Sequence, residues 1–245
     1  MSEYRVLPAG DTAVVVEFGE QIDREVSVKV LALSRCLSDA GLEGIVETVP
    51  TFRSLMIHYD PLVLPTGALI EHIAELAQGL QSTPQSGRRW RLPACYDASI
   101  APDLDDVAAR TGLTPAQVVE CHSSTIYHVY MIGFMPGMAY LGDVPEVLRL
   151  PRRSSPRLKV PAGSLAIATL MSCVYPLETP AGWHLIGRSP VPFLQRHPRP
   201  AALLAPGDTV SFIPVSLREY EDLLAKAAAG ALDIKPTDAK LEAAA

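Results

Sequence analysis

The sequence predicts a small α+β domain followed by a mainly β barrel domain. In the first third of the chain, strand-like β-branched runs alternate with amphipathic helix patterns. Residues 133–190, in contrast, carry prolines and glycines far too often for a helical bundle. Proline fixes φ and glycine permits positive φ, so such a segment folds into bends and short strands. Between the two regions, apolar periodicity is lost at residues 81–89, which indicates a linker.

The first domain, residues 1–80, is expected to contain two strand pairs, each followed by a helix. Asp23 can cap a helix whose valines and leucines recur at helical spacing as far as Gly41, and a second helix is expected at residues 69–80. Two helices on one face of an antiparallel sheet bury these apolar side chains most simply. The four strands are predicted from β-branched runs around turn residues, at 4–7, 12–18, 45–49 and 54–59.

The second domain, residues 90–229, is expected to begin with a strand and two short helices. The run TPAQ at residues 114–117 is a strong helix start, since threonine caps, proline suits the first position and glutamine completes a capping box. Ser216 is expected to cap a closing helix after the last strand. The alanine-rich, polar residues 230–245 are predicted to be a disordered tail.

Composition excludes several classes of partner. The net charge is −6, and the only basic clusters are Arg88-Arg89 and Arg152-Arg153, so we expect no nucleic-acid partner. No apolar run is long enough to span a bilayer and no signal peptide is recognisable, which predicts a cytoplasmic protein without membrane contact. The four cysteines lack CxxC spacing, which indicates reduced thiols and no metal site.

Five short phrases in the second half of the chain occur in an order and spacing that chance rarely produces. They are Gly133-Phe134-x-Pro136-Gly137, Pro151-Arg152…Pro156-Arg157, Val160-Pro161-Ala162-Gly163, Tyr175-Pro176 and Gly182-Trp183-x-Leu185-Ile186-Gly187-Arg188. Together they resemble the family called allophanate hydrolase subunit 1 or KipI, which includes the B subunit of prokaryotic ATP-dependent 5-oxoprolinase. Weaker similarity runs from Gly10-Asp11 to Gly207-Asp208, so the resemblance covers nearly the whole chain.

The resemblance implies that the second domain is a cyclophilin-like barrel and that the chain is one subunit of a hetero-oligomeric, ATP-dependent amidohydrolase, inactive alone. In the 5-oxoprolinase case the assembly hydrolyses 5-oxo-L-proline to L-glutamate. The implied partners are the larger, KipA-like barrel subunit of the same family pair and a third subunit. No P-loop or kinase glycine-rich loop occurs in this chain, so ATP, with or without magnesium, is expected at the assembled complex.

Candidate substrate-binding residues follow from these motif positions. His122 is either a cation favoured by a helix C-terminus or a side chain facing the barrel cleft. The bend at residues 133–137 is either a tight corner or a pocket wall with exposed backbone donors. Arginines beside rigid proline or glycine positions suit carboxylate or phosphate contacts and are expected to share one concave rim. The substrate-binding set is His122, Gly133, Phe134, Pro136, Gly137, Arg152, Arg157, Ser172 and Arg188, and the catalytic residues are unknown.

One segment departs from the family pattern, which has Gln-Thr-Gly before Tyr-Pro. Here Met171 replaces the amide and Cys173 replaces the glycine, while Ser172 keeps a hydroxyl. Ala181 also stands where glycine is usual. A thioether cannot donate the hydrogen bonds of an amide, so the usual substrate does not follow automatically.

Two alternative functions stay open on the sequence. KipI itself is known as an inhibitor of a sensor histidine kinase, so the chain could be a regulatory protein that acts by direct binding. A prolyl isomerase is suggested by fold analogy alone, and a fold does not fix a function.

Overall fold

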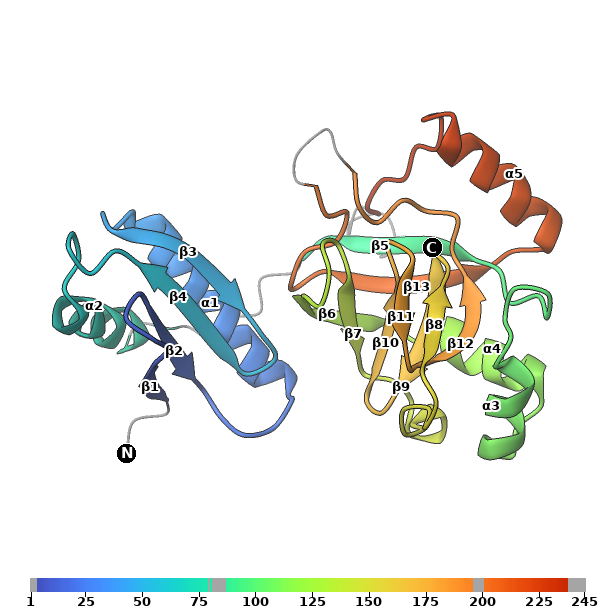
Figure 1. Ribbon diagram of the computed structural model, residues 1–245, viewed down its shortest axis with the longest axis horizontal. Helices are drawn as coiled ribbons and strands as arrows, with labels where there is room; N and C mark the ends of the chain where they lie inside the picture. The colour runs from blue at the N-terminus through green and yellow to red at the C-terminus, as the bar shows by residue number, and fades with distance from the viewer. Residues whose placement is uncertain (1–3, 79, 81–86, 196–200, 238–245) are drawn as a thin grey trace, which may run out of the picture. The chain divides into compact units, whose positions relative to one another are not determined.

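The computed structural model describes residues 4–78, 80, 87–195 and 201–237 (Figure 1). The chain divides into two compact units, Met1–Ser86 and Gly87–Ala245. The expected linker at residues 81–89 therefore lies largely outside the described residues, and Arg89 already belongs to a strand of the second unit.

The first unit is a four-stranded antiparallel sheet with two helices. Helix α1 begins after Asp23, whose carboxylate accepts hydrogen bonds from the amides of Glu25 and Val26, and it ends at Gly41 in the left-handed conformation, so the predicted caps are confirmed. Figure 1 shows α1 running behind β3 and β4. The elements, with the strands in the sheet order β1-β2-β4-β3, are β1 (Arg5–Pro8), β2 (Ala13–Glu17), β3 (Ile45–Pro50), β4 (Ser54–Tyr59), α1 (Arg24–Ala40) and α2 (Thr66–Gln78).

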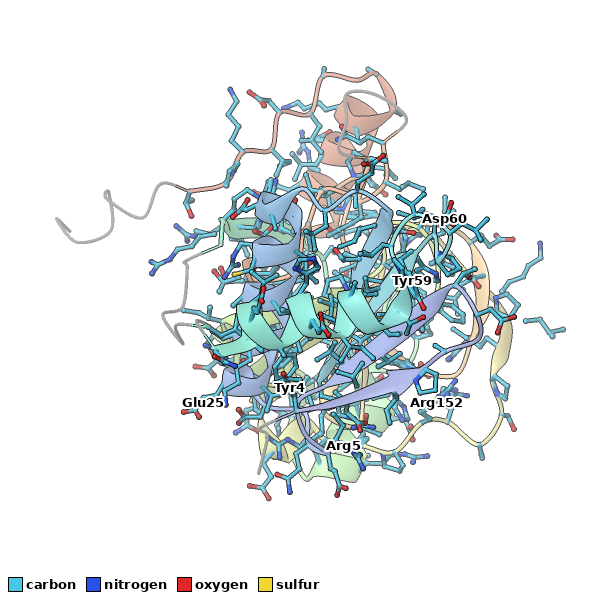
Figure 2. The ribbon with its side chains drawn as sticks, turned by 90° about the vertical axis from the view of Figure 1, so that its left-hand side faces the viewer. Tyr4, Arg5, Glu25, Tyr59, Asp60 and Arg152 are labelled. Carbon is cyan, nitrogen blue, oxygen red and sulfur yellow. The ribbon has the colours of Figure 1, made fainter. Side chains whose placement is uncertain are left out.

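Strand alternation builds the core of this unit. Leu55 and Ile57 of β4 are fully buried in one cluster with Leu33 of α1 and with Leu69 and Ile73 of α2. At the end of β4, the buried Tyr59 is followed by the exposed Asp60, and both are labelled in Figure 2.

The second unit is a mixed seven-stranded sheet that nearly closes into a barrel. Strands β13 and β5 are parallel, and the other neighbours are antiparallel. Cys95, just after β5, and Arg188, in β12, exchange two backbone hydrogen bonds of 2.8 Å, which joins the two edges of the sheet. In sheet order the strands are β12 (His184–Arg188), β9 (Ser164–Ala168), β10 (Met171–Val174), β7 (Ala139–Gly142), β6 (Tyr127–Ile132), β13 (Thr209–Pro214) and β5 (Arg89–Ala94).

The remaining elements of this unit surround the sheet. Strands β8 (Arg157–Val160) and β11 (Thr179–Ala181) pair as a separate two-stranded ribbon. Helices α3 (Leu104–Thr111) and α4 (Pro115–Ser123) pack side by side, and the short 3-10 helix η1 spans Glu146–Leu148. Helix α5 (Leu217–Ala228) lies apart from α3 and α4 (Figure 1). The predicted capping box at Thr114 and the predicted cap at Ser216 are both confirmed, and Ser216 forms a capping box with Glu219 as well.

The barrel strands bury side chains on both of their faces. Ile167 of β9 belongs to a large core under α3 and α4, whereas its neighbour Ala166 belongs to a smaller cluster on the opposite side of the sheet. Cys173 of β10, which pairs with Ala166, lies in that smaller cluster too. This smaller cluster lies next to the pocket described below.

The C-terminal segment differs from the disordered tail expected from residue 230 onward. Residues 230–237 are described: Leu232 and Ile234 pack against the large core, and the Thr237 amide donates a 2.8 Å hydrogen bond to the carbonyl of Arg89. Two apolar side chains and one bridge thus hold this polar stretch on the barrel, and residues 238–245 lie outside the described part. Across the described residues no helix combines the length and apolar character that crossing a bilayer requires.

Candidate functional site

A pocket of about 380 Å³ opens beside the smaller core cluster of the second unit. Residues from five segments line it, because the 133–138 bend, the 152–156 segment and the β11–β12 connection meet the ends of β7 and β10 there. The aromatic residues that line it are Phe134, Tyr140, Tyr175 and Trp183, and the charged residue is Arg152. Smaller contributions come from Met138, Pro156, Thr169, Pro180, Ala181 and Gly182.

Arg152, labelled in Figure 2, alone carries a charge among the described residues that line this pocket. Both of its chain neighbours are anchored. The imidazole of His184 donates through Nε2 to the carbonyl of Pro151 at 2.9 Å, and the Arg153 amide donates to the carbonyl of Gly182 at 2.8 Å. A planar guanidinium on so firmly held a segment is suited to a bidentate contact with a carboxylate.

Aromatic rings form the walls of the pocket. Tyr140 and Trp183 meet edge to face, with ring centroids 5.9 Å apart. Phe134 stands at the rim with 67% of its surface exposed, on a backbone with φ of +66°. A non-glycine residue with positive φ is uncommon, so the bend holds this ring outward at a conformational cost.

The two tyrosines of the pocket are protonated hydrogen-bond donors at neutral pH. Burial raises the pKa of Tyr140 and raises that of Tyr175 well above the ordinary value, and nearby Arg152 opposes both shifts without overcoming them. Tyr175 belongs to the same small cluster as the fully buried Cys173, whose own thiol pKa is raised by burial. The pocket thus offers one fixed positive charge and neutral donors, which suits a small, flat monoanion.

The predicted bend is both a corner and a pocket wall. The Gly133 amide donates to the carbonyl of Met138 at 3.0 Å, which closes the turn, so this backbone donor is not free for a ligand. Gly137 has φ of +79°, and a Cβ there would lie 3.0 Å from the carbonyl oxygen of Phe193. Gly133, Pro136 and Gly137 therefore shape the bend, and Phe134 is its pocket-lining member.

The prediction that three arginines share one concave rim is wrong. Arg157 forms a bidentate pair with the buried carboxylate of Asp103, at 2.8 and 2.7 Å, and does not line the pocket. Arg188 donates through Nη2 to the carbonyl of Ala162 at 2.7 Å and lies at the junction of β12 with Cys95. Arg157 is thus paired with a buried acid and Arg188 forms an exposed hydrogen bond to a backbone carbonyl, so Arg152 is the arginine among the described residues that line the pocket.

His122 and Ser172 are also placed away from the pocket. The ring of His122 is fully buried, with Nδ1 2.9 Å from the hydroxyl of Tyr96 and Nε2 3.1 Å from Oγ of Ser172. Burial lowers its pKa to about 3, so the imidazole is neutral and neither a helix-end cation nor a group facing a cleft. Side chains on β10 alternate between the two faces of the sheet, and Cys173 lies on the face next to the pocket. Ser172 therefore lies on the other face, with His122.

A family model of the carboxyltransferase domain, subdomain C and D, matches residues 4–204.

The chain belongs to this family.

The carboxyltransferase-domain chain is 36% identical to the B subunit of 5-oxoprolinase from Bacillus subtilis over 231 residues, which cover 89% of this chain and 95% of the relative. It is 38% identical to the protein of the same name from Escherichia coli O157:H7 over 215 residues, covering 87% and 97%. The crystal structure of TTHA0988 superposes with a TM-score of 0.74 at 36% identity. That match covers 83% of this chain and 40% of the longer solved chain. The family predicted from the five phrases is thereby confirmed.

The segment that departs from the family pattern lies directly behind the pocket of this carboxyltransferase-domain chain. Cys173 belongs to one buried cluster with Met138 and Tyr175, and Ala181 lines the pocket itself. Met171 is buried. The departure therefore affects the pocket through the residues that support Tyr175.

Of the residues that line the pocket, the predicted substrate-binding set contains Phe134 and Arg152. It lacks Tyr175 and Trp183 among others, and it lacks the buried acid Asp103. Tyr175 and Trp183 each belong to one of the five phrases. Both stand beside proline or glycine within those phrases, a signal that could have added them. Nothing local in the sequence reveals the pairing of Asp103 with Arg157.

Proposed function

We propose that this chain is a subunit of an ATP-dependent 5-oxoprolinase, which converts 5-oxo-L-proline, ATP and water to L-glutamate, ADP and phosphate. The observation that carries the proposal is the similarity to the two bacterial 5-oxoprolinase B subunits, which extends over nearly the full length of both. A match of whole chain to whole chain supports a shared role better than a shared fold does.

The pocket beside Arg152 supports this function. 5-Oxoproline is a small five-membered lactam with one carboxylate, and its size and charge suit a pocket of about 380 Å³ that has one guanidinium. In this proposal Arg152 binds the carboxylate, and Trp183, Tyr140 and Phe134 contact the ring. The neutral hydroxyl of Tyr175 can donate a hydrogen bond to the lactam.

The chemistry of the lactam explains the need for ATP. An amide carbonyl is a poor electrophile, so transfer of the γ-phosphoryl group to the lactam oxygen would convert that oxygen into a leaving group. Water then attacks the same carbon, and the C–N bond opens to give the amine and an acyl phosphate. A second water hydrolyses this acyl phosphate to the new carboxylate of glutamate and free phosphate. Donors fixed around the pocket would stabilise the charge that develops on the oxygen.

ATP itself fits this pocket poorly. A triphosphate needs several cations or a cradle of backbone amides, whereas the pocket has Arg152 alone and the chain contains no P-loop sequence. We therefore assign the nucleotide, with or without magnesium, to the assembled complex with a larger, KipA-like barrel subunit and a third subunit. The chain would be inactive alone, act in the cytoplasm, and contribute a cyclophilin-like barrel to the assembly.

Reconstitution tests the proposal. The purified chain is assayed alone and together with the larger and third subunits from the same organism, with 5-oxoproline and ATP supplied and glutamate and ADP measured. We expect both products in equal amounts from the mixture and none from the chain alone. A mixture that assembles but leaves 5-oxoproline intact would contradict the proposal. Inhibition of a sensor histidine kinase by the isolated chain would favour the regulatory alternative.

A further inference from the structure

The carboxylate of Asp103 is the most heavily bonded side chain near the pocket, although it does not line it. It is almost fully buried, and each of its oxygens accepts two hydrogen bonds. Oδ1 accepts from Arg153 at 2.8 Å and from Arg157 at 2.7 Å. Oδ2 accepts from Arg157 at 2.8 Å and from the backbone amide of Leu185 at 2.7 Å. All four acceptor positions of the carboxylate are therefore filled.

Helix capping does not explain this acid. Asp103 occupies the N-cap of α3, where an aspartate ordinarily accepts hydrogen bonds from the first amides of the helix, yet its side chain makes no such bond. Burial raises its pKa, but the hydrogen bonds from Arg157 and Leu185 outweigh burial and leave the pKa lowered. The side chain is therefore ionised, and it accepts its hydrogen bonds from residues outside helix α3.

The partners of Asp103 belong to two segments that adjoin the pocket. Arg153 directly follows the pocket residue Arg152, and Arg157 directly follows the pocket residue Pro156. Leu185 lies in the strand that begins just after Trp183. The two segments also touch directly, through the bond from the Arg153 amide to Gly182. Hydrogen bonds to this one buried carboxylate thus connect the two segments that adjoin the pocket.

We propose that Asp103 is a positioning residue that fixes Arg152 at a set distance from the Trp183 wall. This inference rests on the proposed role of the pocket and adds to it a residue that no ligand touches. An arginine on a loosely held segment would lose conformational freedom on binding a carboxylate. The hydrogen bonds from Arg153 and Arg157 to Asp103 already restrict this segment, so most of that entropic cost does not arise when the ligand binds.

Asp208 offers a matched control in the same unit. Its carboxylate is also almost fully buried and accepts from Nη2 of Arg88 at 2.7 Å, Nε1 of Trp90 at 2.9 Å and the Ala205 amide at 3.0 Å. None of these partners lines the pocket. Substituting either acid by asparagine removes one buried charge from a similar set of donors, so general destabilisation should be alike while effects on the pocket should differ.

The test compares the full-length Asp103→Asn and Asp208→Asn variants with the wild type. Hydrogen exchange is followed at the Arg153 amide, which bonds Gly182 and not Asp103, so it reports movement of the pocket walls rather than loss of the substituted bond. Binding of 5-oxoproline is measured on the same samples by calorimetry. Arg157→Lys keeps the positive charge but loses the planar guanidinium that bonds both oxygens of Asp103. It serves as a milder second variant if Asp103→Asn does not fold.

We expect exchange at the Arg153 amide to be about tenfold faster or more in Asp103→Asn, because hydrogen bonds to a charged group contribute on that scale. Asp208→Asn should leave this amide unchanged, and 5-oxoproline affinity should fall only in the Asp103 and Arg157 variants. Unchanged exchange in both of those variants, or an equal rise in Asp208→Asn, would overturn the inference. Faster exchange in a protein whose wild type binds no 5-oxoproline would support the positioning role and count against the proposed substrate instead.

Discussion

His122 lies fully buried between Tyr96 and Ser172 and stacks on Phe212 at a centroid distance of 5.2 Å. No charged side chain bonds the ring among the described residues, so burial alone lowers its pKa to about 3. A histidine that hydrogen-bonds two hydroxyls is satisfied as a neutral group and becomes costly when protonated. It thereby connects α4 to β10, to β13 and to the segment that follows β5 in the core.

This burial predicts a pH dependence of stability. The unfolded histidine has a pKa of about 6.5 and the folded one about 3, so between these values the unfolded chain binds a proton that the folded chain does not. The free energy of unfolding should therefore fall as the pH drops below about 6.5, and His122→Gln should remove about 2 kcal/mol of the loss between pH 7 and pH 5. Urea denaturation at the two pH values measures it.

Ser172→Ala serves as the control for this prediction, because it removes a hydrogen-bond partner but keeps the titrating ring. It should lower stability at both pH values and preserve the pH dependence. An unchanged pH dependence in His122→Gln would show that other groups cause the acid sensitivity.

At the same scale, the sequence indicated some site residues but not their partners. Phe134 and Arg152 are predicted from motif positions and both line the pocket. Arg157 stands at an equally good motif position, but it bonds Asp103, which lies 54 residues earlier in the chain. A pairing over that separation depends on how α3 docks against β12, and no local pattern encodes it.

The bend after β6 contains two residues with positive φ, Phe134 and Gly137. Gly137 combines a φ of +79° with close contact to Phe193, whereas Gly112 at the end of α3 has φ of +71° with open space around it. Both positions favour glycine because of their backbone conformation. Gly137 has the additional steric limit.

Comparing alanine substitutions at these two glycines separates the two costs. Gly112→Ala should lower the free energy of unfolding by about 1 kcal/mol through the left-handed backbone alone. Gly137→Ala should cost at least about 1 kcal/mol more, since overpacking adds to the backbone cost. Chemical denaturation measures both values. Equal losses would mean that the bend relaxes freely and does not hold Phe134 in place.

Elements with strong local signals were predictable, and contacts between distant elements were not. The capping boxes at Thr114 and Ser216 and the cap at Asp23 each depend on residues within one turn, which the sequence displays directly. Closure of the barrel joins Cys95 to Arg188, which lie far apart in the sequence. The segment at 231–237 likewise depends on its docking against the barrel and not on its composition.

On the scale of the whole molecule, the two units have separate hydrophobic cores. The core of the first unit is built from β2, β4, α1 and α2, and the two cores of the second unit draw on residues from Trp90 onward. The pocket is lined entirely by described residues of the second unit. The substrate site of the proposed enzyme is thus built within one unit, while the proposal assigns the nucleotide to the assembled complex.

The most direct test is the kinetics of the reconstituted assembly with Arg152→Gln. Lys159→Gln is the matched control, because Lys159 is an exposed cation on β8 that pairs with Glu178 outside the pocket. Loss of a carboxylate contact made in both the ground state and the transition state should raise the KM for 5-oxoproline about tenfold or more with little change in kcat. The account predicts this rise for Arg152→Gln and wild-type kinetics for Lys159→Gln, and an Arg152→Gln assembly with an unchanged KM would contradict it.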